Sequence, residues 1–120
     1  MAGWNVISTG GLLREGTLSL AGSTALKTVQ NYHVDLAIFS AAGLDMSFGV
    51  SETTEFNAGI KQTMIENSRR KILILDKTKF DRVSFVRVCT VSQIDALVTD
   101  ERPSDTWLEH FGEKNVEVYY

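Results

Sequence analysis

The sequence contains little of the chemistry that disulfides, metal sites and membranes require. It has one cysteine and two histidines, so an internal disulfide is excluded and no cluster of Cys and His ligands is visible. No apolar run approaches the roughly 20 residues that span a bilayer. The first residues also lack the charged and apolar regions of a signal peptide. We therefore expect a cytoplasmic protein with no metal, no cofactor and no membrane contact.

Positive charge is scarce as well. The chain has 12 Lys and Arg against 15 Asp and Glu, a net charge of −3. Non-specific DNA binding depends on many cations that neutralise phosphates, so this chain is not expected to bind DNA by itself. The one concentrated basic run is Arg69-Arg70-Lys71. We interpret this run as a complement to the dipole at the end of a predicted helix.

The residues that are present favour a single α/β domain. A chain of 120 residues suits one domain. Short β-prone runs alternate with helical patterns, which indicates βαβ units and a mostly parallel sheet flanked by helices. Strands are predicted at 4–8, 34–39, 71–75, 94–99 and 116–120, with a short strand or hairpin arm within 12–20. Helices are predicted at 22–32, 54–69 and 103–111.

Four finer expectations follow from these elements. The apolar run 34–39 is typical of a strand buried on both faces. Gly112 is a candidate for the left-handed turn that stops the last helix. Cys89 lies in an apolar, β-rich stretch and is predicted to be a small core residue. Trp4 and Trp107 are interpreted as core or interface aromatics.

The loops after the predicted strands carry the candidate ligand-binding residues. Ligands of parallel sheets bind beyond the carboxyl ends of the strands. Glycines let backbone N–H groups approach an anion, lysines hold phosphate as point charges, and carboxylates suit sugar hydroxyls. Such loops suit a small, polyhydroxylated, negatively charged ligand. They contain Gly10 and Gly11, the segment 40–45, the segment 76–80 with Lys77 and Lys79, and Asp100, and the helical Lys61 can reach the same rim.

Each candidate also has a structural alternative that the sequence leaves open. Gly10-Gly11 can form a plain turn, and Asp45 can cap a loop or turn. Lys61 can be a solvated charge on the wet face of its helix, and Asp100 can simply end its strand. The segment after Leu75 is the most specific of these signals, because its polar residues crowd the point where the sheet opens.

The same loops carry a resemblance to a known family. In order and spacing, the sequence resembles the C-terminal effector-sensing domain of the DeoR family of bacterial transcriptional repressors. The resemblance covers nearly the whole chain. The matching stretches are 8–14 (STGGLLR), 20–22 (LAG), 34–45 (VDLAIFSAAGLD) with Gly49, 61–65 (KQTMI), 75–80 (LDKTKF) and 94–100 (IDALVTD).

The resemblance implies a fold like that of ribose-phosphate isomerases and coenzyme A transferases. It implies a sensor domain over residues 1–120 that is truncated at its N-terminus, without the DNA-binding helices and the first part of the sensor. It implies a phosphorylated sugar as effector, operator DNA bound only through the absent domain, and a homo-oligomer. By position, it places these residues in the effector pocket: Gly10, Gly11, Gly43, Asp45, Lys61, Asp76 and Lys79.

Departures from the family pattern bear on the chemistry. The family usually has a Glu four residues before the helical lysine, where this chain has Asn57. Asp81 replaces a Gly, and Ala42 occupies a position that is usually acidic or polar. Two alternatives to a sensor stay open. One is a sugar-phosphate isomerase using the Asp and Lys residues for acid–base chemistry; the other is an oligomerisation module with a vestigial pocket.

Overall fold

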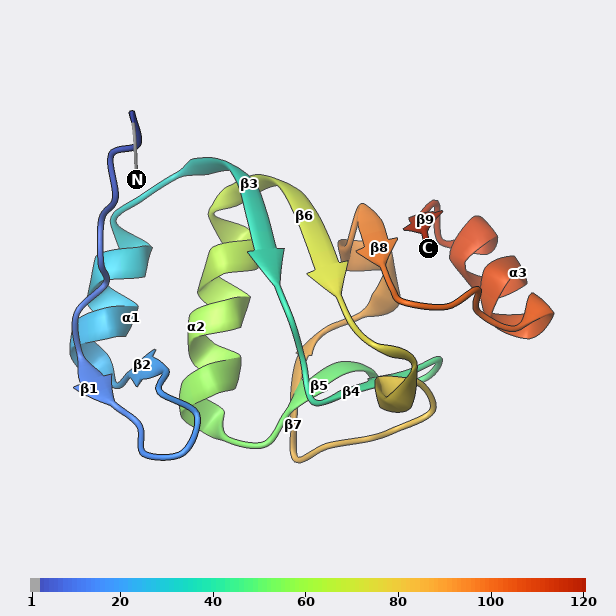
Figure 1. The fold of residues 1–120 in the computed structure, drawn as a ribbon, viewed down its shortest axis with the longest axis horizontal. Coiled ribbons are helices and arrows are strands. Elements are labelled where there is room, and N and C mark those ends of the chain that lie inside the picture. The colour runs from blue at the N-terminus through green and yellow to red at the C-terminus, as the bar shows by residue number, and fades with distance from the viewer. Residues whose placement is uncertain (1–2) are drawn as a thin grey trace.

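The computed structural model describes residues 3–120 and has a four-stranded parallel sheet at its centre (Figure 1). Each strand is parallel to its neighbours. The predicted α/β class with a mostly parallel sheet flanked by helices is therefore confirmed. The strand order is β3-β6-β8-β9, with β3 at Val34–Phe39, β6 at Ser68–Ile74, β8 at Ala96–Val98 and β9 at Glu117–Tyr119.

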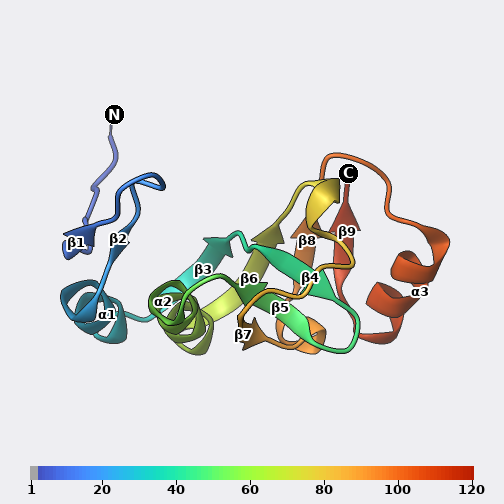
Figure 2. The same cartoon turned by 90° about the horizontal axis from the view of Figure 1, so that it is seen from below.

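Three α-helices surround this sheet: α1 at Ser23–Gln30, α2 at Glu55–Glu66 and α3 at Asp105–Glu113. Helix α2 packs against α1, β3 and β6, whereas α3 packs beside β9 at the far end of the sheet (Figure 2). Thr54 starts α2 by accepting a hydrogen bond from the Asn57 N–H, and Ser104 starts α3 by accepting one from the Trp107 N–H. These caps satisfy N–H groups that have no partner inside the helix.

Two smaller antiparallel units complete the fold. A hairpin joins β1 (Leu12–Leu13) to β2 (Leu20–Ala21), which confirms the predicted hairpin arm. A three-stranded sheet in the order β4-β5-β7 was not predicted by the sequence; its strands are Gly43–Asp45, Gly49–Glu52 and Val86–Cys89. Two 3-10 turns lie between strands: η1 at Lys77–Lys79 and η2 at Val91–Gln93.

The hydrophobic core lies between the two sheets and α3. Its largest fully buried apolar side chains are Phe111, Leu44, Leu73, Ile94 and Leu97. Cys89 and Trp107 are also buried, as the sequence predicted. Within residues 3–120, none of the helices has the length and apolar character needed to cross a bilayer.

Two predictions at the N-terminal side were wrong. Residues 4–8 form no strand. Trp4 is 75% exposed, so it is not a core residue, and its role as an interface aromatic stays a prediction. This β-prone segment has no neighbouring strand with which to form a ladder in the described chain. Strand β3 is not buried on both faces, because Val34, Leu36 and Ile38 are exposed on one of them. In the described part of the chain β3 pairs with β6 alone, which leaves its other edge open.

Two further predictions need correction at helix ends. Helix α2 ends at Glu66 and β6 begins at Ser68, so the run Arg69–Lys71 belongs to a strand and does not cap a helix. There the guanidinium of Arg70 lies 3.1 Å from the Glu117 carboxylate. Gly112 is part of α3, and the left-handed turn falls on Asn115 at φ 59°. Asparagine tolerates this conformation better than most residues do.

Candidate functional site

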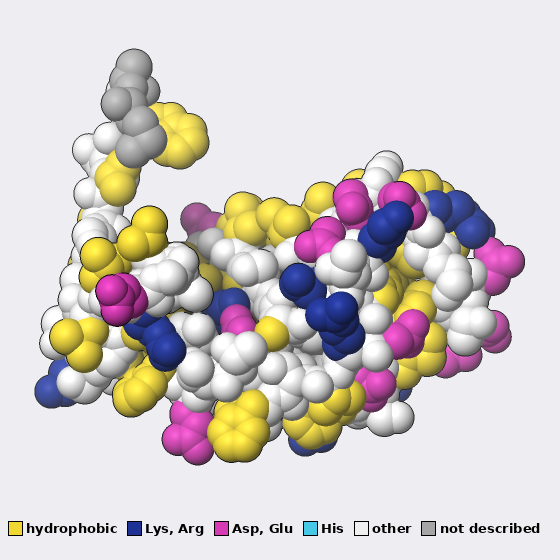
Figure 3. Space-filling view, turned by 60° about the horizontal axis from the view of Figure 1, so that its bottom comes forward, with side chains coloured by type: hydrophobic (Ala, Val, Ile, Leu, Met, Phe, Trp, Pro, Cys, Tyr) yellow, Lys and Arg dark blue, Asp and Glu magenta, His cyan; other side chains and the backbone are white. Residues whose placement is uncertain are grey.

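The carboxyl ends of the parallel strands meet at one edge of the sheet. Phe39 of β3 lies opposite Leu73 of β6, and Ile74 lies opposite Val98 of β8. The residues that follow these strands are therefore neighbours along that edge. In the view that brings this edge forward, Lys and Arg side chains gather near the middle of the face beside Asp and Glu side chains (Figure 3).

Lys61 reaches the end of β3 from α2. Its ammonium donates to the Ser40 carbonyl oxygen and to the Glu52 carboxylate. The side chains of Lys61 and Glu52 are 18% and 9% exposed, so this is a largely buried ion pair. Lys61 is thus not a solvated charge on a wet helix face. Its ammonium stands at the strand-end rim where a ligand was predicted.

Asp76 and Lys79 lie at the end of the neighbouring strand, β6. Asp76 begins the turn η1, and its Oδ1 accepts the Thr78 N–H at 2.8 Å and the Thr78 hydroxyl. These two hydrogen bonds lower the pKa of Asp76. The Lys79 ammonium lies 4.0 Å from Asp76 Oδ2 and keeps part of its surface exposed. This pair can therefore present both a cation and hydrogen-bond acceptors to a ligand.

Acidic residues at the end of β8 hold the same turn. Asp100 Oδ1 accepts the Lys77 N–H at 2.8 Å. The Lys77 ammonium lies 2.9 Å from Glu101 Oε1, and this contact raises the pKa of Lys77. Asp100 therefore does more than end its strand, because it fixes the backbone from which Lys79 projects.

Gly43 and Asp45 lie on β4, which continues directly from the end of β3. A Cβ at Gly43 would come within 2.5 Å of the Arg82 carbonyl oxygen, so close packing requires glycine there. A bridge between Leu44 and Phe80 places β4 beside the turn η1. Asp45 Oδ2 accepts the N–H groups of Ser47 and Phe48 at 3.0 and 2.8 Å. The carboxylate of Asp45 thus closes the turn between β4 and β5.

Gly10 and Gly11 lie apart from these residues, between the β1–β2 hairpin and α1. Gly11 has φ 103°, and a Cβ there would lie 2.6 Å from the Ala21 carbonyl oxygen. Both glycines are exposed and have positive φ, and Gly11 lets the chain pass close to the start of α1. The hairpin reaches toward α2 through Arg14, whose guanidinium contacts the Thr54 hydroxyl at 3.5 Å. The structure thus gathers Gly43, Lys61, Asp76 and Lys79 near one edge, and leaves Gly10 and Gly11 farther away.

Two residues of this region were missed by sequence reasoning. Arg14 lies in the stretch 8–14 that carried the resemblance, but its contact with the start of α2 depends on folding of the hairpin. Glu52 gave no direct signal. An indirect signal was Asn57, which stands where the family usually has a Glu. Without that helical carboxylate, Lys61 pairs with a carboxylate from another element, Glu52 of β5.

The departure at Asp81 has a structural explanation. This residue has φ 59°, a left-handed conformation that glycine adopts freely and aspartate tolerates. Asp81 Oδ1 also accepts the indole N–H of Trp107 at 3.1 Å. Phe80 packs edge-on against the same Trp107 ring, with centroids 5.3 Å apart. Asp81 therefore anchors the loop after η1 to α3, which a glycine would not do.

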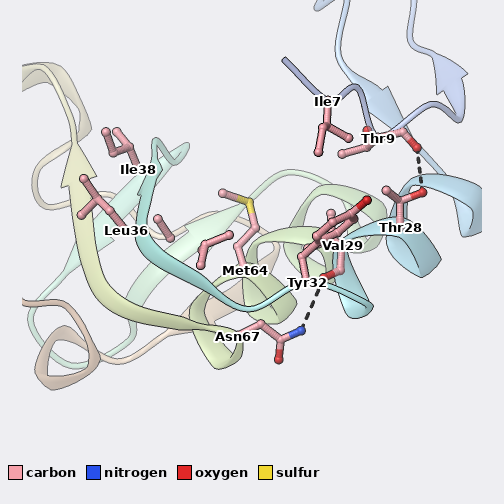
Figure 4. A pocket seen from close by; sticks show the side chains of 11 residues that line it. Ile7, Thr9, Thr28, Val29, Tyr32, Leu36, Ile38, Met64 and Asn67 are labelled. Carbon is pink, nitrogen blue, oxygen red and sulfur yellow. Dashed lines mark hydrogen bonds between the residues drawn. The ribbon is translucent and has the colours of Figure 1, made fainter. Parts of the chain in front are cut away.

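A separate hollow of the described chain lies away from this edge. It is a groove of about 480 Å³ between the N-terminal segment, α1 and the open face of β3 (Figure 4). Its labelled walls include Ile7, Tyr32, Leu36, Ile38 and Met64. None of the predicted ligand-binding residues lines it. This apolar groove does not suit a charged, polyhydroxylated ligand.

Comparison with known proteins bears on the meaning of the strand-end site. The family described as DeoR C terminal sensor domain matches residues 1–101. The chain belongs to this family. The recognition made from the strand-end motifs is therefore confirmed.

Individual relatives of this DeoR sensor domain are transcriptional regulators by name. The HTH-type transcriptional regulator YulB of Bacillus subtilis is 34% identical over 114 residues, which are 95% of this chain and 44% of YulB. The glycerol-3-phosphate regulon repressor of Escherichia coli is 30% identical over 100 residues, 83% of this chain and 40% of the repressor. The L-fucose operon activator of Haemophilus influenzae is 29% identical over 99 residues, 82% and 40% respectively.

The chain thus spans less than half of the length of each of these relatives. Their names describe regulators, which favours a sensor and not a sugar-phosphate isomerase. The likeness to ribose-phosphate isomerases and coenzyme A transferases remains a prediction from the resemblance.

Proposed function

We propose that this DeoR sensor domain binds a phosphorylated sugar or a related anionic metabolite at the carboxyl edge of its parallel sheet. The observation that carries the proposal is the placement of Lys61 and Lys79 at the ends of two adjacent strands, β3 and β6. Two ammonium groups can share one phosphate, because each acts as a point charge that needs no fixed planar geometry.

The hydroxyls of such a ligand also find partners at this edge. Asp76 Oδ2 faces Lys79 and can accept a hydrogen bond from a sugar hydroxyl. Gly43 keeps the backbone of β4 close to the turn η1 and so shapes the wall of the site. Gly10, Gly11 and Asp45 stay in the predicted pocket through the resemblance. In this structure Asp45 closes a turn, and Gly10 and Gly11 follow a segment that forms no strand.

The proposed regulatory step is a shift between two arrangements of a longer regulator. A ligand that binds one arrangement better than the other changes its population, and linkage then changes the affinity for operator DNA. In this proposal DNA is bound only by a domain outside residues 1–120. The names of two relatives refer to a glycerol-3-phosphate regulon and an L-fucose operon, which supports a phosphorylated or sugar-derived effector.

A homo-oligomer and a cytoplasmic location belong to the same proposal. Within residues 3–120 one edge of β3 has no strand partner, and Val34, Leu36 and Ile38 of β3 are exposed. Together they form an apolar surface that favours association. Sedimentation velocity over a range of protein concentrations tests the oligomer, and a monomer at every concentration contradicts it. A bacterial repressor must reach its operator DNA, and this DNA lies in the cytoplasm. We therefore propose a cytoplasmic location.

The ligand is tested by thermal unfolding against a panel of phosphorylated pentoses, hexoses and trioses at millimolar concentration. A ligand at 100 times its dissociation constant stabilises the native state by about 2.7 kcal/mol. For a domain of this size that corresponds to a rise of several degrees in Tm. The rise should disappear in Lys79→Ala and persist in Lys27→Ala, a matched change on an exposed residue of α1.

Two results would contradict the proposal. A shift that survives Lys79→Ala moves the ligand away from the strand-end site. No shift with any member of the panel favours the alternative of an oligomerisation module with a vestigial pocket. Turnover of any panel member would instead reopen the isomerase alternative.

A further inference from the structure

The Lys61 ammonium, which is proposed to bind the effector, already has hydrogen-bond partners in this structure. Lys61 donates to the Glu52 carboxylate and to the Ser40 carbonyl oxygen. An anion that approaches Lys61 therefore meets a neutralised pair and not a free cation. The strength of Lys61 as an anion ligand depends on Glu52, a residue outside the predicted pocket.

Glu52 is held in place on both sides of its carboxylate. It is the last residue of β5, and it is buried although it is charged. Its Oε1 accepts the Thr53 N–H at 3.2 Å, while Oε2 faces Lys61. A buried carboxylate without a partner is strongly unfavourable, so Glu52 and Lys61 depend on each other.

The position of Glu52 connects the site to the rest of the fold. It is followed after one residue by Thr54, which caps α2, and Thr54 is also contacted by Arg14 from the β1–β2 hairpin. Any ligand that draws Lys61 away from Glu52 leaves a buried charge at the junction of β5 and α2. Relief of that charge requires a rearrangement at this junction.

We propose that Glu52 is a positioning residue for the strand-end pocket. It holds the Lys61 ammonium against the end of β3 and attenuates its charge, so that an anionic effector binds by sharing or displacing this carboxylate. The proposal rests on the proposed function for its ligand, whereas its first step, the restraint of Lys61, is independent of any ligand.

The restraint is tested by reductive methylation of the chain, with each lysine followed by peptide mass spectrometry. Exposed Lys27 serves as the internal reference. In the unchanged protein Lys61 should react about tenfold more slowly than Lys27, because its amine is buried and bonded. Glu52→Gln should raise the Lys61 rate severalfold. Glu55→Gln, the same change at an exposed position in the first turn of α2, should leave it unchanged.

The effect on binding is tested with inorganic phosphate and with the phosphorylated sugars of the thermal panel. Glu52→Gln keeps the shape and an acceptor oxygen but removes the charge, so it should tighten binding by about tenfold. Damage to the fold would weaken binding, so a gain of affinity is specific to this proposal. In a double-mutant cycle, Glu52→Gln should not tighten binding when Lys61→Met is already present, because the gain depends on the Lys61 ammonium.

The outcomes separate the two proposals. If a sugar phosphate binds the unchanged protein and Glu52→Gln does not tighten it, the role of Glu52 is overturned and the effector site stands. If Lys61 reacts as fast as Lys27 in the unchanged protein, the restraint itself is overturned. If Glu52→Gln frees Lys61 and still neither phosphate nor a sugar phosphate binds any variant, both the effector site and the role of Glu52 in it fail.

Discussion

Residues 3–38 and residues 39–120 of this domain are packed in different ways. We call them the open part and the packed part. The members of the core cluster all lie between Phe39 and Val116, in the packed part. The buried apolar residues of the described open part are three alanines, Ala21, Ala25 and Ala37. Most of the exposed large apolar side chains of the described chain lie in the open part.

The difference in packing indicates which part of the chain contributes most of the folding stability. Burial of apolar area stabilises a fold by about 25 cal/mol per Å², and alanines bury little of it. Residues 39–120 therefore hold the domain together, and they also carry Gly43, Lys61, Asp76 and Lys79 of the candidate site. The open part instead offers apolar surface along β3 and the groove.

The largest expected contrast is in thiol reactivity. Burial raises the pKa of the Cys89 thiol from 9.0 to about 12, so at pH 8 it has about a thousandfold less thiolate than an ordinary cysteine. Cys89 should react with a disulfide reagent only as the packed part unfolds. A thiol placed in the open part by Leu36→Cys, in a Cys89→Ala background, should react at once. Comparable rates would contradict the division into two parts.

The next contrast is in stability and uses the same substitution twice. Leu97 is fully buried, so Leu97→Ala should lower the free energy of unfolding by about 3 kcal/mol through lost contacts and a cavity. Leu36 lies on the exposed face of β3, so Leu36→Ala should change it by less than about 1 kcal/mol. Urea unfolding measures both variants. Equal losses would show that the open face of β3 is covered in solution.

A smaller contrast concerns the two tryptophans. Trp107→Phe removes the indole hydrogen bond to Asp81 and leaves a void in the core, so it should lower the free energy of unfolding by about 2 kcal/mol. The exposed Trp4 should tolerate the same change within about 0.5 kcal/mol. Urea unfolding measures both variants. If Trp107→Phe is as stable as Trp4→Phe, the hydrogen bond from Trp107 to Asp81 does not anchor the loop.

The smallest effect is expected at the exposed edge of the packed part. Hydrogen bonds from Thr78 favour the charged carboxylate of Asp76 and lower its pKa below its ordinary 3.8. A lowered native pKa means that the contribution to stability is present above pH 3.8 and is lost as the pH falls through the native pKa. Because Asp76 is solvent-exposed, this contribution is small.

Thr78→Ala tests this edge directly. Loss of the hydroxyl donor should move the pKa of Asp76 up toward its ordinary value, while the backbone N–H of residue 78 keeps part of the shift. Titration of the side-chain carboxyl carbon by NMR measures the change. An unchanged pKa would mean that the hydroxyl of Thr78 does not bond to Asp76 in solution.

Much of the candidate site could be predicted because its residues come directly after predicted strands in the sequence. The apolar runs at 34–39 and 71–75 identified β3 and β6, and the polar residues after them were placed at one edge by the parallel arrangement alone. Lys61 was expected at this rim, and the structure places its ammonium there. The sequence allows either a ligand contact or a turn at Asp45, and its hydrogen bonds in the structure close a turn.

The fold class, the family and the strand-end loops can be predicted from the sequence, because each depends on short stretches of neighbouring residues. The other features depend on tertiary contacts. Strands β4, β5 and β7 have three or four residues each, too few for a recognisable period. The pair of Glu52 with Lys61, the bond of Asp81 to Trp107 and the open face of β3 all depend on which distant segments meet. Burial and pairing depend on contacts between segments that are distant in the sequence, so no local sequence pattern predicts them.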